Sequence, residues 1–118
     1  MKKLLALLLI NFAFICRAQG EMKFDELPFK DLIAKAKKEN KLVFIDAYAS
    51  WCGPCKMMER NIFPKKSVGD VYNKSFVNAR IDMEKGEGRE IAQKYGVRSY
   101  PTYLFLNGDG ELISQNFG

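Results

Sequence analysis

Trp51-Cys52-Gly53-Pro54-Cys55-Lys56 follows an apolar run and stands where a helix is predicted to begin. Its two thiols are three positions apart, near the unpaired backbone N–H groups and the positive end of the helix dipole. Both features favour the thiolate over the thiol at Cys52, and the thiolate is the nucleophile in disulfide exchange. We therefore expect Cys52 to attack a disulfide and Cys55, one turn deeper, to displace the bound partner. Gly53 and Pro54 keep the loop tight enough for the two sulfurs to meet.

Three other uses of a cysteine pair fit this chain less well. A bridge over two intervening residues removes little chain entropy, so it does little to staple a fold. Structural zinc takes four protein ligands, and the chain has no histidine to complete such a set. Two thiolates could bind Cu(I), but the arrangement Met-x-Cys-x-x-Cys is absent. We therefore predict no metal, and no cofactor other than the Cys52–Cys55 disulfide itself.

The surrounding sequence predicts helices that alternate with strands. Residues 42–45 form the continuous apolar run that is typical of a central strand covered on both faces. Apolar periodicity and turn residues predict helices at 28–40, 52–62, 66–74 and 89–95. Strands are expected at 22–24, 41–49, 76–83, 102–106 and 111–115, with a hairpin turn at 107–110. This order predicts an α/β fold with a central mixed sheet flanked by helices.

The first 20 residues are predicted to be a signal peptide. Positively charged residues are followed by the apolar stretch 4–16, and small residues at 18–20 suit cleavage. The apolar stretch is shorter than the roughly 20 residues that a membrane-spanning helix needs. A retained anchor and a lipid-modified Cys16 are the alternatives. We expect an exported protein, periplasmic or extracellular, whose mature domain spans 21–118 and keeps only Cys52 and Cys55.

Composition and charge favour one globular domain. The chain has 118 residues, of which 47% are hydrophobic and 28% are charged, and these proportions are typical of a folded protein. The formal charge is +5, but three of the basic residues and none of the acids lie in the predicted signal peptide. The mature domain therefore has a formal charge of +2, which indicates a solvated surface and not a nucleic-acid binding face.

Two segments of the chain resemble thioredoxin. Asp46-Ala-Tyr-Ala-Ser-Trp-Cys-Gly-Pro-Cys-Lys56 is similar to the active-site segment of that family, and Tyr95-Gly-Val-Arg-Ser-Tyr-Pro-Thr102 is similar to the segment that carries its cis-proline. The likeness extends from about residue 42 to residue 118, with the elements in the family's order. It implies a thioredoxin-like fold and a thiol–disulfide oxidoreductase, which exchanges a dithiol or disulfide with protein substrates.

The resemblance also implies roles for individual residues. Cys52 matches the nucleophilic cysteine of the family and Cys55 the resolving one, while Trp51 matches the tryptophan beside the active site. Pro101 matches the cis-proline that faces the disulfide and holds substrate backbone, and a cis bond would bring Tyr100 close to the sulfurs. An ordinary proline at the start of a strand is the alternative for Pro101. The expected substrate-binding residues are Trp51, Gly53, Pro54, Tyr100 and Pro101.

Asp46 interrupts the apolar strand and matches the family's buried aspartate, which takes the proton from the resolving cysteine. A carboxyl within such a strand loses hydration, so its pKa is expected to rise toward the range that is useful for a base. The alternative is that Asp46 is a hydrogen-bonded polar residue at a strand end, with no role in proton transfer. Where thioredoxin has a lysine partner on the next strand, this chain has Asn78. We therefore expect Asp46 to lack that basic partner and to be less ionised.

Two further departures concern substrate preference and the end of the chain. Ser99 and Tyr100 replace the small and aliphatic residues that usually precede the cis-proline, which favours a substrate preference different from that of a cytosolic thioredoxin. The sequence stops at Gly118, where the last helix of the family would begin. Either the chain is truncated there, or one face of the sheet stays partly uncovered. The second alternative predicts an exposed apolar patch and association.

The direction of electron transfer depends on how strongly the thiolate is stabilised. Strong oxidants of the superfamily have a histidine between their cysteines, whereas this chain has Gly53 and Pro54 there. The couple should be nearer to thioredoxin, at about −270 mV, than to the strongest oxidants, at about −120 mV, even though exported proteins meet an oxidising environment. We predict a protein-disulfide reductase whose disulfide is reduced by an upstream dithiol donor. A membrane-bound protein is a candidate for that donor. The rival prediction is a non-catalytic polypeptide-binding module or chaperone.

Overall fold

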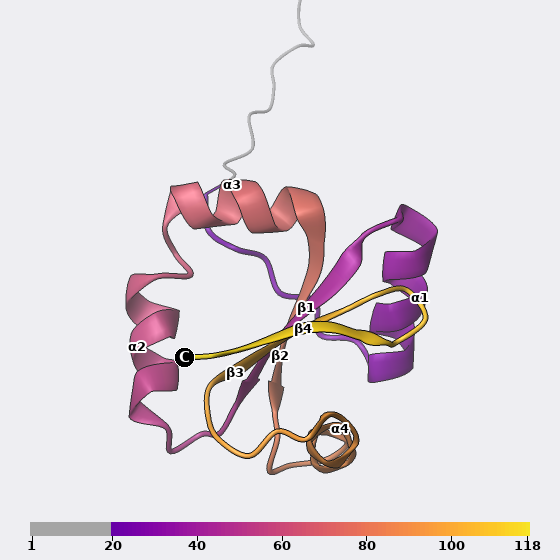
Figure 1. The fold of residues 1–118 in the computed structure, drawn as a ribbon. Helices are drawn as coiled ribbons and strands as arrows, with labels where there is room; N and C mark the ends of the chain where they lie inside the picture. The colour runs from indigo at the N-terminus through magenta and orange to yellow at the C-terminus, as the bar shows by residue number, and fades with distance from the viewer. Residues whose placement is uncertain (1–19) are drawn as a thin grey trace, which may run out of the picture.

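The computed structural model describes residues 20–118, which contain four helices and four strands (Figure 1). In chain order the elements are α1 (Phe29–Glu39), β1 (Leu42–Tyr48), α2 (Gly53–Asn61), α3 (Lys66–Ser75), β2 (Phe76–Asp82), α4 (Gly88–Tyr95), β3 (Thr102–Leu106) and β4 (Leu112–Phe117). Residues 1–19 of the predicted signal peptide lie outside this description. None of the helices in residues 20–118 is long and apolar enough to cross a bilayer.

The strands form one mixed sheet in the order β2-β1-β3-β4. β1 pairs with β2 in parallel and with β3 antiparallel, and β3 pairs antiparallel with β4. Parallel pairing of β1 with β2 requires a long crossover connection, and α2 and α3 supply it. β1 is therefore a central strand, and its five middle residues are all buried. The predicted mixed sheet flanked by helices is confirmed.

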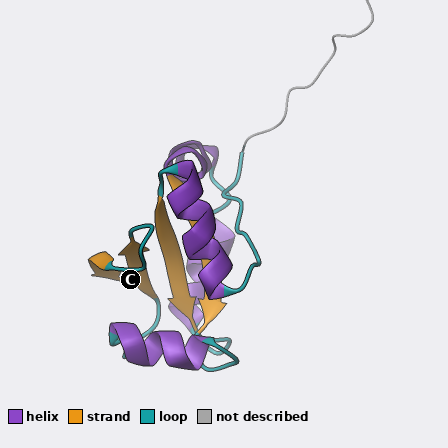
Figure 2. Ribbon diagram, turned by 90° about the vertical axis from the view of Figure 1, so that its right-hand side faces the viewer, coloured by secondary structure: helices purple, strands orange, loops and turns teal. Residues whose placement is uncertain are grey.

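Helices cover both faces of the sheet because alternate residues of β1 point to opposite sides. Val43 and Ile45 pack in one buried cluster with residues of α1 and α4. Phe44 packs in a second cluster with residues of α2 and α3. In Figure 1, α1 at the right and α2 at the left lie on opposite sides of the strands, and Figure 2 shows α1 in front of the sheet. Asp46, two residues after Phe44, shares the face toward α2.

The predicted edge strand at 22–24 is wrong. The N–H of Met22 donates to the carbonyl of Phe63 at 3.1 Å, and the N–H of Asp25 donates to the carbonyl of Asn78 at 2.8 Å. These are isolated hydrogen bonds and not a ladder. Met22 is buried in the apolar cluster around Phe44, so packing of one side chain anchors this segment. The boundaries of all the other elements lie within two residues of those predicted.

The face of the sheet toward α2 and α3 is partly open. β4 extends to Phe117, and within residues 20–118 no helix follows it. Apolar side chains of the sheet, α2 and α3, including Phe44, Tyr103 and Phe105, line a groove of about 230 Å³. Elsewhere on the sheet, Ile113 and Phe117 of β4 are 56% and 69% exposed, and Phe117, the partner of Thr102, lies on the face opposite the groove. Apolar side chains therefore line an open groove on this face, and others are exposed on β4.

Candidate active site

Cys52 caps the N-terminus of α2. Its backbone is extended, with φ −81° and ψ 116°, and its sulfur accepts a hydrogen bond from the N–H of Cys55 at 3.1 Å. Pro54 lies in the first turn, where its missing N–H leaves no intrahelical hydrogen bond unmade. Because β1 ends at Tyr48, the cysteine pair follows the carboxyl end of a central strand. The first cysteine thus lies at the positive end of a helix dipole, as predicted.

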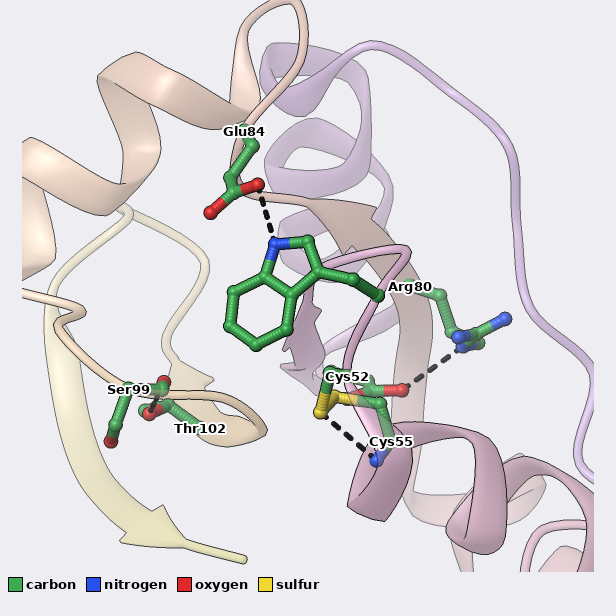
Figure 3. Close-up of a disulfide and its surroundings, with 8 residues drawn as sticks. Cys52, Cys55, Arg80, Glu84, Ser99 and Thr102 are labelled. Carbon is green, nitrogen blue, oxygen red and sulfur yellow. Dashed lines mark hydrogen bonds and ion pairs between the residues drawn. A yellow bond between two sulfur atoms is a disulfide. The ribbon is translucent and has the colours of Figure 1, made fainter.

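Cys52 and Cys55 form a disulfide, and their Cα atoms are 5.3 Å apart, within the usual range for this bond (Figure 3). Both residues are almost fully buried, with exposures of 2% and 1%. Together with Ala49 they form a small cluster against which Tyr48 and Tyr100 pack. The two sulfurs are therefore enclosed by the side chains around them.

The Tyr100–Pro101 peptide bond is cis, as the resemblance implies. Thr102, the first residue of β3, is paired antiparallel with Ala47 of β1. This pairing brings the loop before β3 to the same end of the sheet as the disulfide after β1. The Thr102 hydroxyl donates to the carbonyl of Ser99 at 2.7 Å and closes the loop (Figure 3). Tyr100 is thereby held against the cysteine cluster.

Trp51 is 65% exposed and is held by a carboxylate that sequence reasoning did not identify. Its Nε1–H donates to Oε1 of Glu84 at 2.9 Å (Figure 3). Its ring meets that of Tyr100 edge to face, with centroids 5.8 Å apart. Glu84 lies just after β2 and resembles any other surface acid in the sequence, so only the fold reveals its contact. Trp51 and Tyr100 form an aromatic rim beside the disulfide.

The residues expected to bind substrate gather around the disulfide. Gly53 and Pro54 are exposed between the two buried cysteines, and Pro101, the next residue after Tyr100, is buried. Within residues 20–118, no three His, Cys, Asp or Glu side chains are grouped as a metal site requires.

Asp46 is 1% exposed on β1. Its Oδ2 accepts a hydrogen bond from Nε of Arg80 at 3.0 Å. Its Oδ1 is buried and has no hydrogen-bond partner among the described residues. Loss of hydration raises the pKa of Asp46 above its ordinary value, and the hydrogen bond and charge of Arg80 only partly oppose this rise. The carboxyl is therefore both buried and able to accept a proton.

The expectation that Asp46 lacks a basic partner is wrong. Asn78 stands opposite Phe44 in the β1–β2 register, and its side-chain amide donates to the carbonyl of Tyr72 at 3.2 Å. Arg80 stands opposite Asp46 and supplies the positive charge. Because side chains two residues apart on a strand share a face, Asn78 and Arg80 point to the same side of β2. A basic residue two positions further along the strand was the signal that could have identified the partner.

The fold and this site define a class of protein. A disulfide at the start of the helix that follows a central strand, beside a cis-proline, is the arrangement of thioredoxin-like thiol–disulfide oxidoreductases. The family model for the thioredoxin-like domain matches residues 29–117. The chain belongs to this family.

Known relatives agree with this assignment. Thioredoxin-1 of Drosophila melanogaster is 42% identical over 76 residues, which are 64% of this chain and 66% of that protein, just under two thirds of its length. Thioredoxin of Chlorobaculum thiosulfatiphilum is 33% identical over 96 residues, 81% of this chain and 83% of that protein. The solution structure of a candidate disulphide-isomerase from Bacteroides thetaiotaomicron is 43% identical and has a TM-score of 0.75, covering 86% of this chain and 84% of that one.

Proposed function

We propose that this protein is a protein-disulfide reductase that works through Cys52 and Cys55. The observation that carries the proposal is a disulfide at the start of α2 that packs against the tyrosine of a cis Tyr100–Pro101 bond. The aromatic rim of Trp51 and Tyr100 offers contact surface to an extended substrate. The substrate class is a second protein that carries a disulfide.

The reaction begins with the reduced protein. The Cys52 thiolate attacks one sulfur of the substrate disulfide, forms a mixed disulfide and releases the other substrate sulfur as a thiolate. Asp46 then takes the proton of the Cys55 thiol, and the new thiolate attacks the sulfur of Cys52. This second exchange closes the Cys52–Cys55 bond and releases the remaining substrate thiolate. Two electrons have passed to the substrate, whose thiolates take up protons from water, and Asp46 returns its proton to water.

The reducing direction is tested by measuring the reduction potential of the pair. The described site holds no histidine, since the chain has none, so thiolate stabilisation comes from the helix dipole and the N–H of Cys55. We expect a potential near that of thioredoxin, about −270 mV. Equilibration with dithiothreitol or glutathione redox buffers, followed through fluorescence of the single tryptophan beside the disulfide, gives the value. A potential near about −120 mV would reverse the proposed direction.

We also propose that the protein is exported and acts in the periplasm or outside the cell as the domain 21–118. The support is the charge and hydropathy pattern of residues 1–20. A dithiol donor would reduce the Cys52–Cys55 disulfide again after each turnover, and a membrane-bound protein is a candidate for that donor. Expression of the full chain should yield a mature protein that begins at Glu21 and is found outside the cytoplasm. Mass spectrometry of an intact cytoplasmic chain that retains Met1 would contradict export.

A further inference from the structure

Three charged side chains lie in a row beside the disulfide. Arg80 of β2 donates from Nε to Oδ2 of Asp46 and from Nη1 to Oε2 of Glu59, and both distances are 3.0 Å. The two carboxylates therefore share one guanidinium group. Exposure rises steadily along the row, since the side chains of Asp46, Arg80 and Glu59 are 1%, 19% and 51% exposed. The row connects a buried carboxyl to solvent.

The row is attached to the elements that carry the disulfide. Glu59 lies on α2, four residues after Cys55, so the two side chains lie on one face of the same helix. The guanidinium carbon of Arg80 lies 4.2 Å from the centre of the Tyr48 ring, and Tyr48 packs against the cysteine cluster. Figure 3 draws Arg80 in the same view as the two cysteines, and the dashed line at its guanidinium group is the hydrogen bond to Asp46. Glu59 is therefore connected to the cysteine cluster through Arg80 and Tyr48.

Arg80 has one positive charge and two acidic partners, Asp46 and Glu59. The ion pair with one carboxylate therefore affects how strongly Arg80 stabilises the other. Burial raises the pKa of Asp46, Arg80 lowers it, and the negative charge of Glu59 raises it. Two phenols also interact with Asp46. Tyr48 lies on the same strand as Asp46. Tyr103 is the residue of β3 paired with Asp46, and burial raises the pKa of Tyr103 to about 12. Neither phenol ionises near neutral pH, so Arg80 and Glu59 are the charged groups that adjust the pKa of Asp46 from the value that burial sets.

We propose that Arg80 and Glu59 are positioning residues that set the protonation of Asp46 in opposite senses. Arg80 holds Oδ2 of Asp46 and leaves Oδ1 free to receive a proton. Glu59 draws part of the guanidinium charge away from Asp46 and keeps the carboxyl basic enough to accept that proton. This inference rests on the proposed function, in which Asp46 takes the proton of Cys55.

The test compares Arg80→Gln, Arg80→Lys and Glu59→Gln with the parent protein. The carboxyl carbon of Asp46 is followed by ¹³C NMR from pH 4 to 10, and the rate of insulin-disulfide reduction is measured over the range in which the protein stays folded. Arg80→Gln should move the midpoint of both curves to higher pH, and Arg80→Lys should restore part of the shift. Glu59→Gln should move the midpoint to lower pH by about a few tenths of a unit, because Glu59 is half exposed and solvent screens its charge.

Shifts of opposite sign in Arg80→Gln and Glu59→Gln distinguish an effect on the protonation of Asp46 from a purely structural role. Loss of packing would slow disulfide reduction in both variants without moving the midpoint of the Asp46 titration in either. Asp70→Asn is the matched control, because Asp70 is an exposed acid on α3 paired with Lys66, and its curves should coincide with those of the parent. The inference would be overturned if the Asp46 titration of Glu59→Gln had the same midpoint as that of the parent, or a midpoint at higher pH. Glu59→Gln therefore tests the inference even if Arg80→Gln does not fold. If the parent fails to reduce disulfides at all, the proposed function fails instead, while the NMR titration still tests the coupling.

Discussion

Cys52→Ser is expected to abolish disulfide exchange, with a loss of about three orders of magnitude or more in rate. A serine hydroxyl stays protonated at neutral pH and cannot form the mixed disulfide, whereas the helix N-terminus favours the thiolate of Cys52. The measurement is the reduction of insulin disulfides by dithiothreitol with and without the variant. The variant should give the uncatalysed rate.

Cys55→Ser is the matched variant, because it removes the same disulfide and leaves the nucleophile. It should accumulate a mixed disulfide through Cys52, visible as a substrate adduct that dithiothreitol releases. Both variants should unfold with similar free energies, since a bridge between residues 52 and 55 constrains the chain very little. The rival chaperone predicts another outcome. If Cys52→Ser protects unfolded polypeptides from aggregation as well as the parent does, and the parent shows no exchange, the binding module is correct.

Asp46→Asn is expected to stabilise the protein at neutral and higher pH. Burial raises the pKa of Asp46 above its ordinary value, so the folded protein holds this proton more tightly than the unfolded chain does. Asp46 therefore favours folding fully below the ordinary pKa of about 3.9, and this contribution is lost as the pH rises through the raised value. Asparagine does not ionise, so the variant escapes this loss. Arg80 keeps Glu59 as a partner and is not left unpaired.

Urea unfolding of the oxidised proteins at pH 4 and pH 8 measures this effect. The free energy of unfolding of Asp46→Asn should exceed that of the parent at pH 8, on the scale of about 1.4 kcal/mol for each pH unit by which folding raises the pKa of Asp46. The difference should shrink toward pH 4. The same variant should reduce insulin more slowly, because Cys55 has lost its proton acceptor. A variant less stable than the parent at both pH values would show that Arg80 depends on the carboxylate of Asp46 for its own burial.

Much of the fold could be read from local patterns. The apolar run at 42–45 identified a central strand, and Asn40 and Gly96 marked helix ends, where both residues adopt positive φ. The prediction of a strand at 22–24 failed. An extended segment that is anchored by one buried side chain, here Met22, has the same sequence pattern as a short strand. Hydrogen bonding to a neighbouring strand separates the two cases, and that depends on residues more than 35 positions away in the chain.

The prediction about the basic partner of Asp46 failed for a related reason. Matching positions with a known family pointed to Asn78, but the parallel register between β1 and β2 placed Arg80 opposite the carboxyl. Register depends on how two distant strands pack into one sheet, and no local pattern in either strand contains it. The contacts of Glu84 with Trp51 and of Glu59 with Arg80 were hidden in the same way.

By itself the sequence determined the order of the elements, the cysteine pair at a helix start and the proline beside it, because turns, helix ends and apolar periods depend on neighbours in the chain. Tertiary structure alone decided which charges meet Asp46, which carboxylate holds Trp51 and how deeply both sulfurs are buried. Those properties depend on pairing between segments far apart in the chain, and strand register and side-chain packing exist only in the folded molecule.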